Sequence, residues 1–236
     1  MGQPLMESSS QTAESLSHPK RTLVIMAKAP RPGMVKTRLA GSLATASVTA
    51  LYRCLLEDTL ALATSLKGVE VAVVCPEADQ EELAELVGNA VQVVAQKGEG
   101  LAAGLNYVFR HFTEGGGQRV VAFNADSPHL PGSVLESAFE ALNRNDMVVG
   151  PTEDGGYYLV GAKTAYPSLF NRDGLGTRNA LEALLARARE LQLSVGFTVP
   201  FYDVDVEGDL TRLAAELQLD AARAPRTAAW LNRWRR

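Results

Sequence analysis

The sequence has few of the residues that mark several common classes of protein. It contains two cysteines in 236 residues, and the spacing of Cys54 and Cys75 fits neither a disulfide framework nor a zinc site. The net charge is −4, so we expect no broad basic surface for nucleic acid or acidic membranes. No apolar run is long enough to cross a bilayer. These absences favour a globular protein of the reducing cytoplasm that binds neither nucleic acid nor membrane.

The N-terminal segment differs in composition from the rest of the chain. Residues 1–20 are rich in Ser, Gln and Glu and lack the apolar stretch of a signal peptide. We therefore expect them to form a disordered leader. Residues 21–236 have no internal repeat and no interior linker, and their length suits one large α/β domain.

Short apolar runs alternate with segments of helical periodicity along residues 21–236. The runs predict strands at 22–27, 69–75, 91–95, 120–124, 147–149 and 194–199, with an extended segment or hairpin arm at 155–161. The periodic segments predict helices at 48–66, 77–87, 101–112, 133–142 and 177–191, followed by a helical C-terminal tail. Repeated βα units predict a three-layer α/β/α fold with a mostly parallel sheet, whose ligands bind outside the carboxyl ends of the strands.

The loop after the first expected strand is the most informative segment. It begins at Ala27 and Lys28, contains two prolines and Gly33, and carries three further cations: Arg31, Lys36 and Arg38. Backbone N–H groups, a following helix N-terminus and these cations would together hold a polyphosphate. The glycine spacing excludes a Walker A loop and a GxGxxG fingerprint. The alternative interpretation is a solvated basic turn that caps a helix.

Carboxylates follow the fourth expected strand and the last one. Asp126 comes directly after the run VVAF, where a charge is costly to bury unless it is paired or binds a metal; a helix N-cap is the alternative. In an extended segment Asp203 and Asp205 point the same way, and their repulsion favours a nearby cation. Because Mg²⁺ takes one or two protein carboxylates together with phosphates, we expect Asp126 and Asp205 to hold Mg²⁺ or Mn²⁺. Asp209 is expected only to start the last helix.

Residues 150–159 form the densest turn signal in the chain. Gly155 and Gly156 allow positive φ and a close backbone approach to a ligand. Glu153 and Asp154 lie at the end of a strand, so we expect these four residues to contact an acceptor, with Asp154 in a catalytic role. A plain hairpin is the alternative.

Two other residues carry weaker signals. Arg178 lies in a glycine-bearing loop and could meet a phosphate, although the same loop is also explained by Thr177 capping the next helix. His129 has no partner at metal-ligand spacing, and we expect it to be structural.

Four segments carry a family resemblance: TLVIMAKAPRPGMVKTRLA, FNADSPHLP, GPTEDGGYYLVGA and YDVDVEGDL. They resemble the DUF2064 group of GT-A-fold proteins, often described as glycosyltransferases, over residues 21 to about 219. This resemblance implies a Rossmann-like fold of the nucleotide-diphospho-sugar transferase type. Residues 36–39, 104–106 and 176–181 are similar to segments of phospholactate guanylyltransferases, and DVDVEGDL is similar to a segment of molybdenum-cofactor guanylyltransferases.

The guanylyltransferase resemblance implies roles for individual residues. Lys36 and Arg38 would contact phosphates, Asp126 and Asp205 the metal, and Gly100 and Asn106 the base or ribose. The usual DUF2064 pattern has Leu-Gly-x-Arg after the third strand, where this chain has LAAG at residues 101–104. That departure favours the guanylyltransferase-like reading.

We therefore expect a Mg²⁺-dependent nucleotidylyltransferase that moves a nucleoside monophosphate from an NTP, with GTP favoured, to a small phosphorylated acceptor. Its expected catalytic residues are Lys36, Arg38, Asp126 and Asp154. The expected nucleotide contacts are Ala27, Lys28, Arg31, Gly33, Lys36, Arg38, Gly100, Asn106 and Asp126. A glycosyltransferase that passes sugar from a nucleotide-sugar to an acceptor is the first alternative, and a non-catalytic nucleotide-binding protein is the second. A homodimer is compatible with the sequence.

Overall fold

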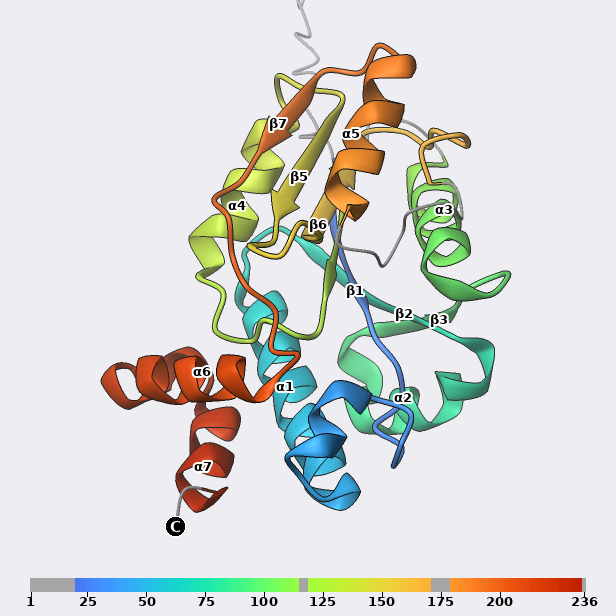
Figure 1. The fold of residues 1–236 in the computed structure, drawn as a ribbon. Coiled ribbons are helices and arrows are strands. Elements are labelled where there is room, and N and C mark those ends of the chain that lie inside the picture. Colours follow the sequence, from blue (N-terminus) through green and yellow to red (C-terminus); the bar gives the residue numbers. More distant parts are fainter. Residues whose placement is uncertain (1–19, 115–118, 171–178, 235–236) are drawn as a thin grey trace, which may run out of the picture.

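A computed structural model describes residues 20–114, 119–170 and 179–234. At its centre is a seven-stranded sheet in the order β3-β2-β1-β4-β6-β5-β7 (Figure 1). Its strands coincide closely with the apolar runs: β1 Arg21–Met26, β2 Glu70–Cys75, β3 Gln92–Ala95, β4 Arg119–Asn124, β5 Met147–Pro151, β6 Tyr157–Ala162 and β7 Val195–Phe197. The strand predictions are thus confirmed to within a few residues at each end.

The sheet is mostly parallel, as predicted. β1 pairs in parallel with β2 and β4, β2 with β3, and β5 with β7. β6 runs antiparallel to both of its neighbours because a short turn at residues 152–156 returns the chain from β5. The segment 155–161 therefore contains the hairpin arm that its glycines predicted. The carboxyl ends of β1 to β5 all meet at one edge of the sheet.

Helices cover both faces of the sheet, which confirms the three-layer prediction. One face carries α1 Thr45–Ser65, α2 Gln80–Val87 and α4 Gly132–Ala141; the other carries α3 Gly100–Thr113 and α5 Ala180–Glu190. The side chains of β1 alternate between the two layers, since Leu23 and Ile25 pack with α1 and α4 whereas Val24 packs with α3. The two layers of helices therefore bury both faces of the sheet, and polar groups lie at its edges.

The C-terminal helices pack against α1 on the side away from the sheet (Figure 1). α6 spans Glu207–Leu219 and α7 spans Pro225–Trp234, with a short 3-10 turn, η4 Ala221–Arg223, between them. Asp58 of α1 is buried, and its carboxylate accepts hydrogen bonds from the backbone amides of Arg226 (3.2 Å) and Thr227 (2.8 Å). A buried carboxylate is satisfied here by the N-terminus of a helix, which fixes α7 to α1.

Some expectations concern residues outside the described ranges. The predicted leader at 1–20 lies there except for Lys20, as do Thr177 and Arg178; the helix predicted at 177–191 is described from Ala180 onward. The assignment of residues 21–236 to one domain stays a prediction. None of the helices in the described ranges is long and apolar enough to span a membrane.

Candidate active site

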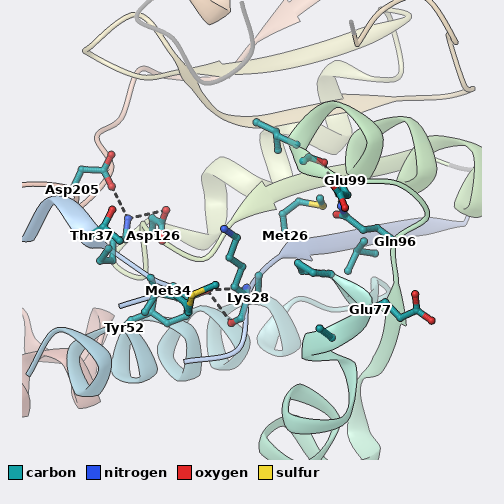
Figure 2. Close-up of a pocket in the computed structure, with 18 of the residues that line it drawn as sticks. Met26, Lys28, Met34, Thr37, Tyr52, Glu77, Gln96, Glu99, Asp126 and Asp205 are labelled. Carbon is teal, nitrogen blue, oxygen red and sulfur yellow. Dashed lines mark hydrogen bonds and ion pairs between the residues drawn. The ribbon is translucent and has the colours of Figure 1, made fainter. Parts of the chain in front are cut away.

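A cavity of about 1040 Å³ opens beside the carboxyl ends of β1, β2 and β3 (Figure 2). The loop after β1 lines it with residues 27–28 and 34–38, and the loops after β2 and β3 contribute residues 76–78, 96 and 98–101. Asp126, after β4, and Asp205, before α6, complete the wall next to Lys36. The cavity therefore lies where ligands bind in open α/β sheets.

The loop after β1 is held rigidly on the side of the cavity. The Tyr52 hydroxyl accepts a hydrogen bond from the backbone N–H of Lys28 (3.0 Å) and donates one to the Lys28 carbonyl (3.2 Å). Asp79, the last residue of the 3-10 turn η2 Glu77–Asp79, accepts from the backbone N–H of Ala29 (3.1 Å) and from Arg31 (2.8 Å). These contacts fix the backbone on both sides of Lys28, so its side chain projects from a preset position.

The end of this loop changes direction at Lys36, whose backbone is in the left-handed conformation. Lys36 has φ 46° and ψ 42°, and the 3-10 turn η1 Thr37–Gly41 follows it directly. We expected the N-terminus of the next long helix to face the anion, but no residue of the first turn of α1 lines the cavity. Instead η1 lies there, together with the start of α3 at Gly100. The two prolines and the left-handed turn delay the α-helix until Thr45.

Lys36 joins the two carboxylates that the sequence predicted as metal ligands. Its Nζ lies 2.8 Å from Asp126 Oδ2 and 2.7 Å from Asp205 Oδ1, and its side chain is only 5% exposed. Arg38 Nη1 lies 3.2 Å from the other oxygen of Asp205, with its side chain 61% exposed. Figure 2 shows Asp126 and Asp205 close to each other at one end of the group of lining residues.

The segment before α6 is attached to the end of β4 by its backbone and by Asp203. The amide of Val204 donates to the carbonyl of Asp126 (3.2 Å). Asp203 accepts from the side chains of Asn124 (2.7 Å) and Ser127 (3.1 Å). With Asp203 engaged on the sheet, Asp205 two residues later reaches the cavity on the same side of the chain.

Asp209 has the structural role that the sequence predicted. Its carboxylate accepts hydrogen bonds from the backbone amides of Asp205 and Val206, both at 2.8 Å. It thereby closes the first turn of α6 and fixes the backbone of Asp205.

Charges in this cluster shift one another's protonation. Burial alone would lower the pKa of Lys36, but the carboxylates of Asp126 and Asp205 outweigh it and raise that pKa. Burial would raise the pKa of Asp205, whereas the Lys36 and Arg38 cations lower it. Burial and the Asp126 charge raise the pKa of Asp203 to about 6. Lys36 and Asp205 therefore form a charged pair at neutral pH.

The structure brings most of the predicted nucleotide contacts to this cavity. Its lining includes Ala27, Lys28, Lys36, Arg38, Gly100 and Asp126, together with the predicted metal ligand Asp205. Three others are not among the lining residues: Arg31, Gly33 and Asn106. The guanidinium of Arg31 is engaged by Glu82 (2.7 Å) and Asp79, and the Asn106 amide donates to the Phe170 carbonyl (2.8 Å). Both side chains hold neighbouring elements together in this structure.

The predicted acceptor residues lie at the same edge of the sheet but do not line the cavity. Glu153 forms two hydrogen bonds with Arg212 of α6, at 2.7 and 3.0 Å. Asp154 accepts from the Thr152 hydroxyl (2.7 Å) and the Gly156 amide (3.3 Å), and Gly155 has φ 92°. The Asp154 contacts build the turn between β5 and β6, and the Glu153 contacts join that turn to α6. Arg178 lies outside the described residues.

Several residues of the site carried no local signal in the sequence. Tyr52 lies on the apolar face of a helix, and Asp79 on a helix that reads as solvent-facing and acidic. Met34 and Leu101 line the cavity as large apolar side chains that are 62% and 44% exposed. Their apolar character next to Gly33 and Gly100 was the one available signal.

The donor atoms at the Lys36 end of the cavity fit a hard divalent cation. Asp126 and Asp205 converge on one point, and both are partly exposed to the cavity, at 28% and 37%. In the described part of the chain no three or more His, Cys, Asp or Glu residues gather as a metal-binding group. A site that takes two carboxylates, with phosphates and water as its other ligands, needs no third protein donor.

Solved structures share this fold. A protein from Desulfovibrio desulfuricans G20, provisionally named a nucleotide-diphospho-sugar transferase, is 26% identical with a TM-score of 0.84; the match covers 91% of this chain and 94% of that one. A 4-diphosphocytidyl-2C-methyl-D-erythritol synthase from Anaerococcus prevotii DSM 20548 is 13% identical with a TM-score of 0.55, over 84% and 95% of the two chains.

A third structure with this fold is the manganese complex of Rv0371c from Mycobacterium tuberculosis H37Rv. It is 18% identical with a TM-score of 0.50, over 84% and 98% of the two chains. A search of curated proteins finds no match.

One family model matches residues 59–177, which make up half of the chain. It is described as "Uncharacterized protein conserved in bacteria (DUF2064)". The matched region includes Asp126 and the β5–β6 turn, whereas the loop after β1 and Asp205 lie on either side of it. The chain therefore belongs to the DUF2064 family, as its motifs predicted.

Proposed function

We propose that this protein is a nucleotidylyltransferase that depends on a divalent metal. It transfers a nucleoside monophosphate from an NTP to a small phosphorylated acceptor and releases pyrophosphate. The observation that carries the proposal is the convergence of Lys36, Arg38, Asp126 and Asp205 at one end of a cavity of about 1040 Å³. Cations and carboxylates meet there at the carboxyl edge of a parallel sheet, where phosphates bind in such folds.

The proposed reaction makes modest covalent demands on the protein. A phosphate oxygen of the acceptor attacks the α-phosphorus of the NTP, and the bond from that phosphorus to the α–β bridging oxygen breaks. Both electrons of that bond leave with pyrophosphate, and no proton transfer is needed because the attacking oxygen is already an anion. Positioning and charge stabilisation supply the catalysis in such a reaction.

Each cation of the cavity has a proposed role. Lys28 projects into the cavity from a fixed backbone and would attract the triphosphate, and Lys36 would bind it at the carboxylate end. Arg38 lies at the exposed rim, where it would stabilise the charge that develops on the leaving pyrophosphate. A divalent cation held by Asp126 and Asp205 would add further neutralisation of phosphate charge.

The acceptor and the base are assigned by position and by resemblance. The turn at residues 152–156 lies at the same edge of the sheet, so we propose that Glu153, Asp154 and the turn glycines face the acceptor. Guanosine is the proposed nucleoside because residues 36–39, 104–106 and 176–181 resemble phospholactate guanylyltransferases. Gly100 would lie near its ribose or base.

A glycosyltransferase is the second candidate, because the Desulfovibrio protein with a TM-score of 0.84 is provisionally named a nucleotide-diphospho-sugar transferase. The same cavity would then hold a nucleotide-sugar, and a nucleoside diphosphate would leave in place of pyrophosphate. The two reactions differ in their co-products, so product analysis separates them.

The test is an incubation of the purified protein with Mg²⁺ or Mn²⁺, each of the four NTPs and a panel of small phosphorylated acceptors, followed by a pyrophosphate assay. We expect pyrophosphate release with GTP and at least one acceptor, and release lowered by about 10²-fold or more in an Asp126→Asn variant. Nucleoside diphosphate release from a nucleotide-sugar, without pyrophosphate from any NTP, would support the glycosyltransferase instead. Nucleotide binding without any turnover would indicate a non-catalytic protein.

A thermal-shift screen would choose the nucleotide before that assay. A ligand present at about 100 times its Kd raises the free energy of unfolding by roughly 2.7 kcal/mol, which is readily measured.

A further inference from the structure

The cation nearest the proposed metal ligands belongs to the protein itself. Lys36 Nζ lies within 2.8 Å of Asp126 and 2.7 Å of Asp205, so it occupies the point on which both carboxylates converge. Its side chain is 5% exposed. A divalent ion that took both of these oxygens would have to displace the ammonium from them.

The local backbone prepares this contact. Lys36 and Gln192 are the only non-glycine residues of the described ranges with positive φ. A left-handed conformation is unfavourable for a residue with a Cβ atom and persists where its surroundings impose it. Here Val35 is buried before it, and the Leu39 amide donates to the Lys36 carbonyl (2.9 Å) after it. The turn thus keeps the ammonium at the carboxylates.

Lys28 offers a direct contrast within the same cavity. It also lines the cavity, and its side chain extends into the cavity in Figure 2. It is exposed, and in the described ranges its ammonium takes part in no ion pair. One lysine of the cavity is therefore available to an incoming anion, whereas the other is already neutralised by the protein.

We infer that Lys36 is an internal counter-ion that occupies the Asp126–Asp205 site and keeps a divalent cation out until a polyphosphate draws the ammonium away. This inference rests on the proposed function for the identity of the polyphosphate. If the metal entered alone, it would leave a buried ammonium without a counter-charge, which is costly. A polyphosphate supplies that charge, so metal and polyphosphate each promote binding of the other.

The inference makes a counter-intuitive prediction for the protein without nucleotide. We would titrate Mn²⁺ alone into the wild type, Lys36→Met and Lys28→Met, and measure free Mn²⁺ by electron paramagnetic resonance. Lys36→Met should bind Mn²⁺ about tenfold more tightly than the wild type, a factor typical of the coupling between two linked sites. Lys28→Met removes one positive charge from the same cavity and serves as the matched control, with an expected change of less than about threefold.

A second set of variants controls for loss of folding and tests whether the added Mn²⁺ affinity arises at Asp126. Lys36→Met leaves two carboxylates without their ammonium, so Lys36→Gln, whose amide can still donate to one of them, is measured in parallel. Adding Asp126→Asn to either variant should abolish the gain in Mn²⁺ affinity. The inference is overturned if neither Lys36 variant binds Mn²⁺ more tightly than the wild type, or if Lys28→Met gains as much. Because no nucleotide is present, this result is independent of whether the protein releases pyrophosphate from an NTP.

Discussion

Two charged turns lie at the same edge of the sheet and behave differently. In the loop after β1, Lys36 and Arg38 pair with Asp205, 169 and 167 positions away along the chain. In the turn between β5 and β6, Asp154 bonds to Thr152 and Gly156, each two positions away. The first turn directs Lys36 and Arg38 at a cavity, whereas in the second turn Asp154 builds the turn itself and Glu153 pairs with Arg212 of α6. Charged residues and glycines in a turn therefore do not by themselves show which role the charges take, because that depends on where their partners lie.

We expect the largest effect from neutralising the two carboxylates that face Lys36 in the first turn. We expect Asp126→Asn and Asp205→Asn each to lower pyrophosphate release by about 10²-fold or more, by analogy with the loss of one charge-stabilising group. Both variants should remain folded, because each keeps its shape and an oxygen that can accept from Lys36. Steady-state rates together with circular dichroism would check this. Rates close to wild type in either variant would refute the metal assignment.

A buried histidine, His129, packs against the segment that lies next to the second turn, and its protonation gives the next test. His129 is fully buried against the rings of Phe201 and Tyr202, and neither ring nitrogen has a hydrogen-bond partner. Phe201 in turn accepts from the Glu153 amide (3.2 Å). Burial, with smaller contributions from the Arg223 and Arg212 cations, lowers the pKa of His129 from 6.5 to about 3.

The sign of the resulting pH dependence follows from that lowered pKa. In acid the unfolded chain takes up the proton first, so the free energy of unfolding falls as the pH drops below 6.5. We expect the wild type to lose about 2 kcal/mol relative to His129→Leu between pH 6.5 and about pH 4.5. Urea unfolding of both proteins across this range is the measurement. Parallel pH profiles would show that the imidazole is not kept neutral by burial.

Arg38 offers a test of the rim of the first turn. Its side chain is 61% exposed and touches Asp205, so we expect it to act on the leaving pyrophosphate more than on nucleotide binding. Arg38→Ala should lower kcat about tenfold and raise KM for the NTP by less than that. Lys163→Ala, next to β6, is the control and should change neither constant. A larger change in KM than in kcat would assign Arg38 to ground-state binding.

The smallest effect is expected in the second turn. Glu153 and Arg212 form an exposed pair, with side chains 52% and 46% exposed, and such pairs contribute about 0–1 kcal/mol to stability. Glu153→Gln should therefore change stability by less than about 1 kcal/mol and leave nucleotide affinity unchanged. Isothermal calorimetry and urea unfolding would test both statements. A loss of nucleotide affinity comparable to that of a cavity residue would remove the distinction between the two turns.

The order and type of the elements could be predicted because their signals are local. The apolar positions of α1, among them Val48, Leu51 and Leu55, recur at the spacing of one helix face and are buried as that spacing requires. The strand predicted at 147–149 ends two residues too early, because Gly150 and Pro151 continue the pairing with β6 across a bulge. Glycine and proline usually indicate the end of a strand, but here the pairing with β6 extends the strand through both residues.

The candidate site could be predicted only in part. Lys36, Arg38, Asp126 and Asp205 were named from strand ends and from resemblance, and they meet at the cavity. The residues that hold the loop in place, Tyr52 and Asp79, could not be predicted, because they look like ordinary helix residues in the sequence. Arg31 looked the same as its neighbouring cations, yet Asp79 and Glu82 engage it away from the cavity lining.

The sequence by itself determined the alternating α/β order, the cationic loop after β1 and the carboxylates at the strand ends, because periodicity and turn chemistry act over a few residues. Only the tertiary structure decided which carboxylates face which cations. Lys36 meets Asp205 because the sheet brings the ends of β1 and β4 side by side and the Val204 amide attaches the segment before α6 to Asp126. Such contacts depend on how distant segments pack, and no local pattern in the chain encodes them.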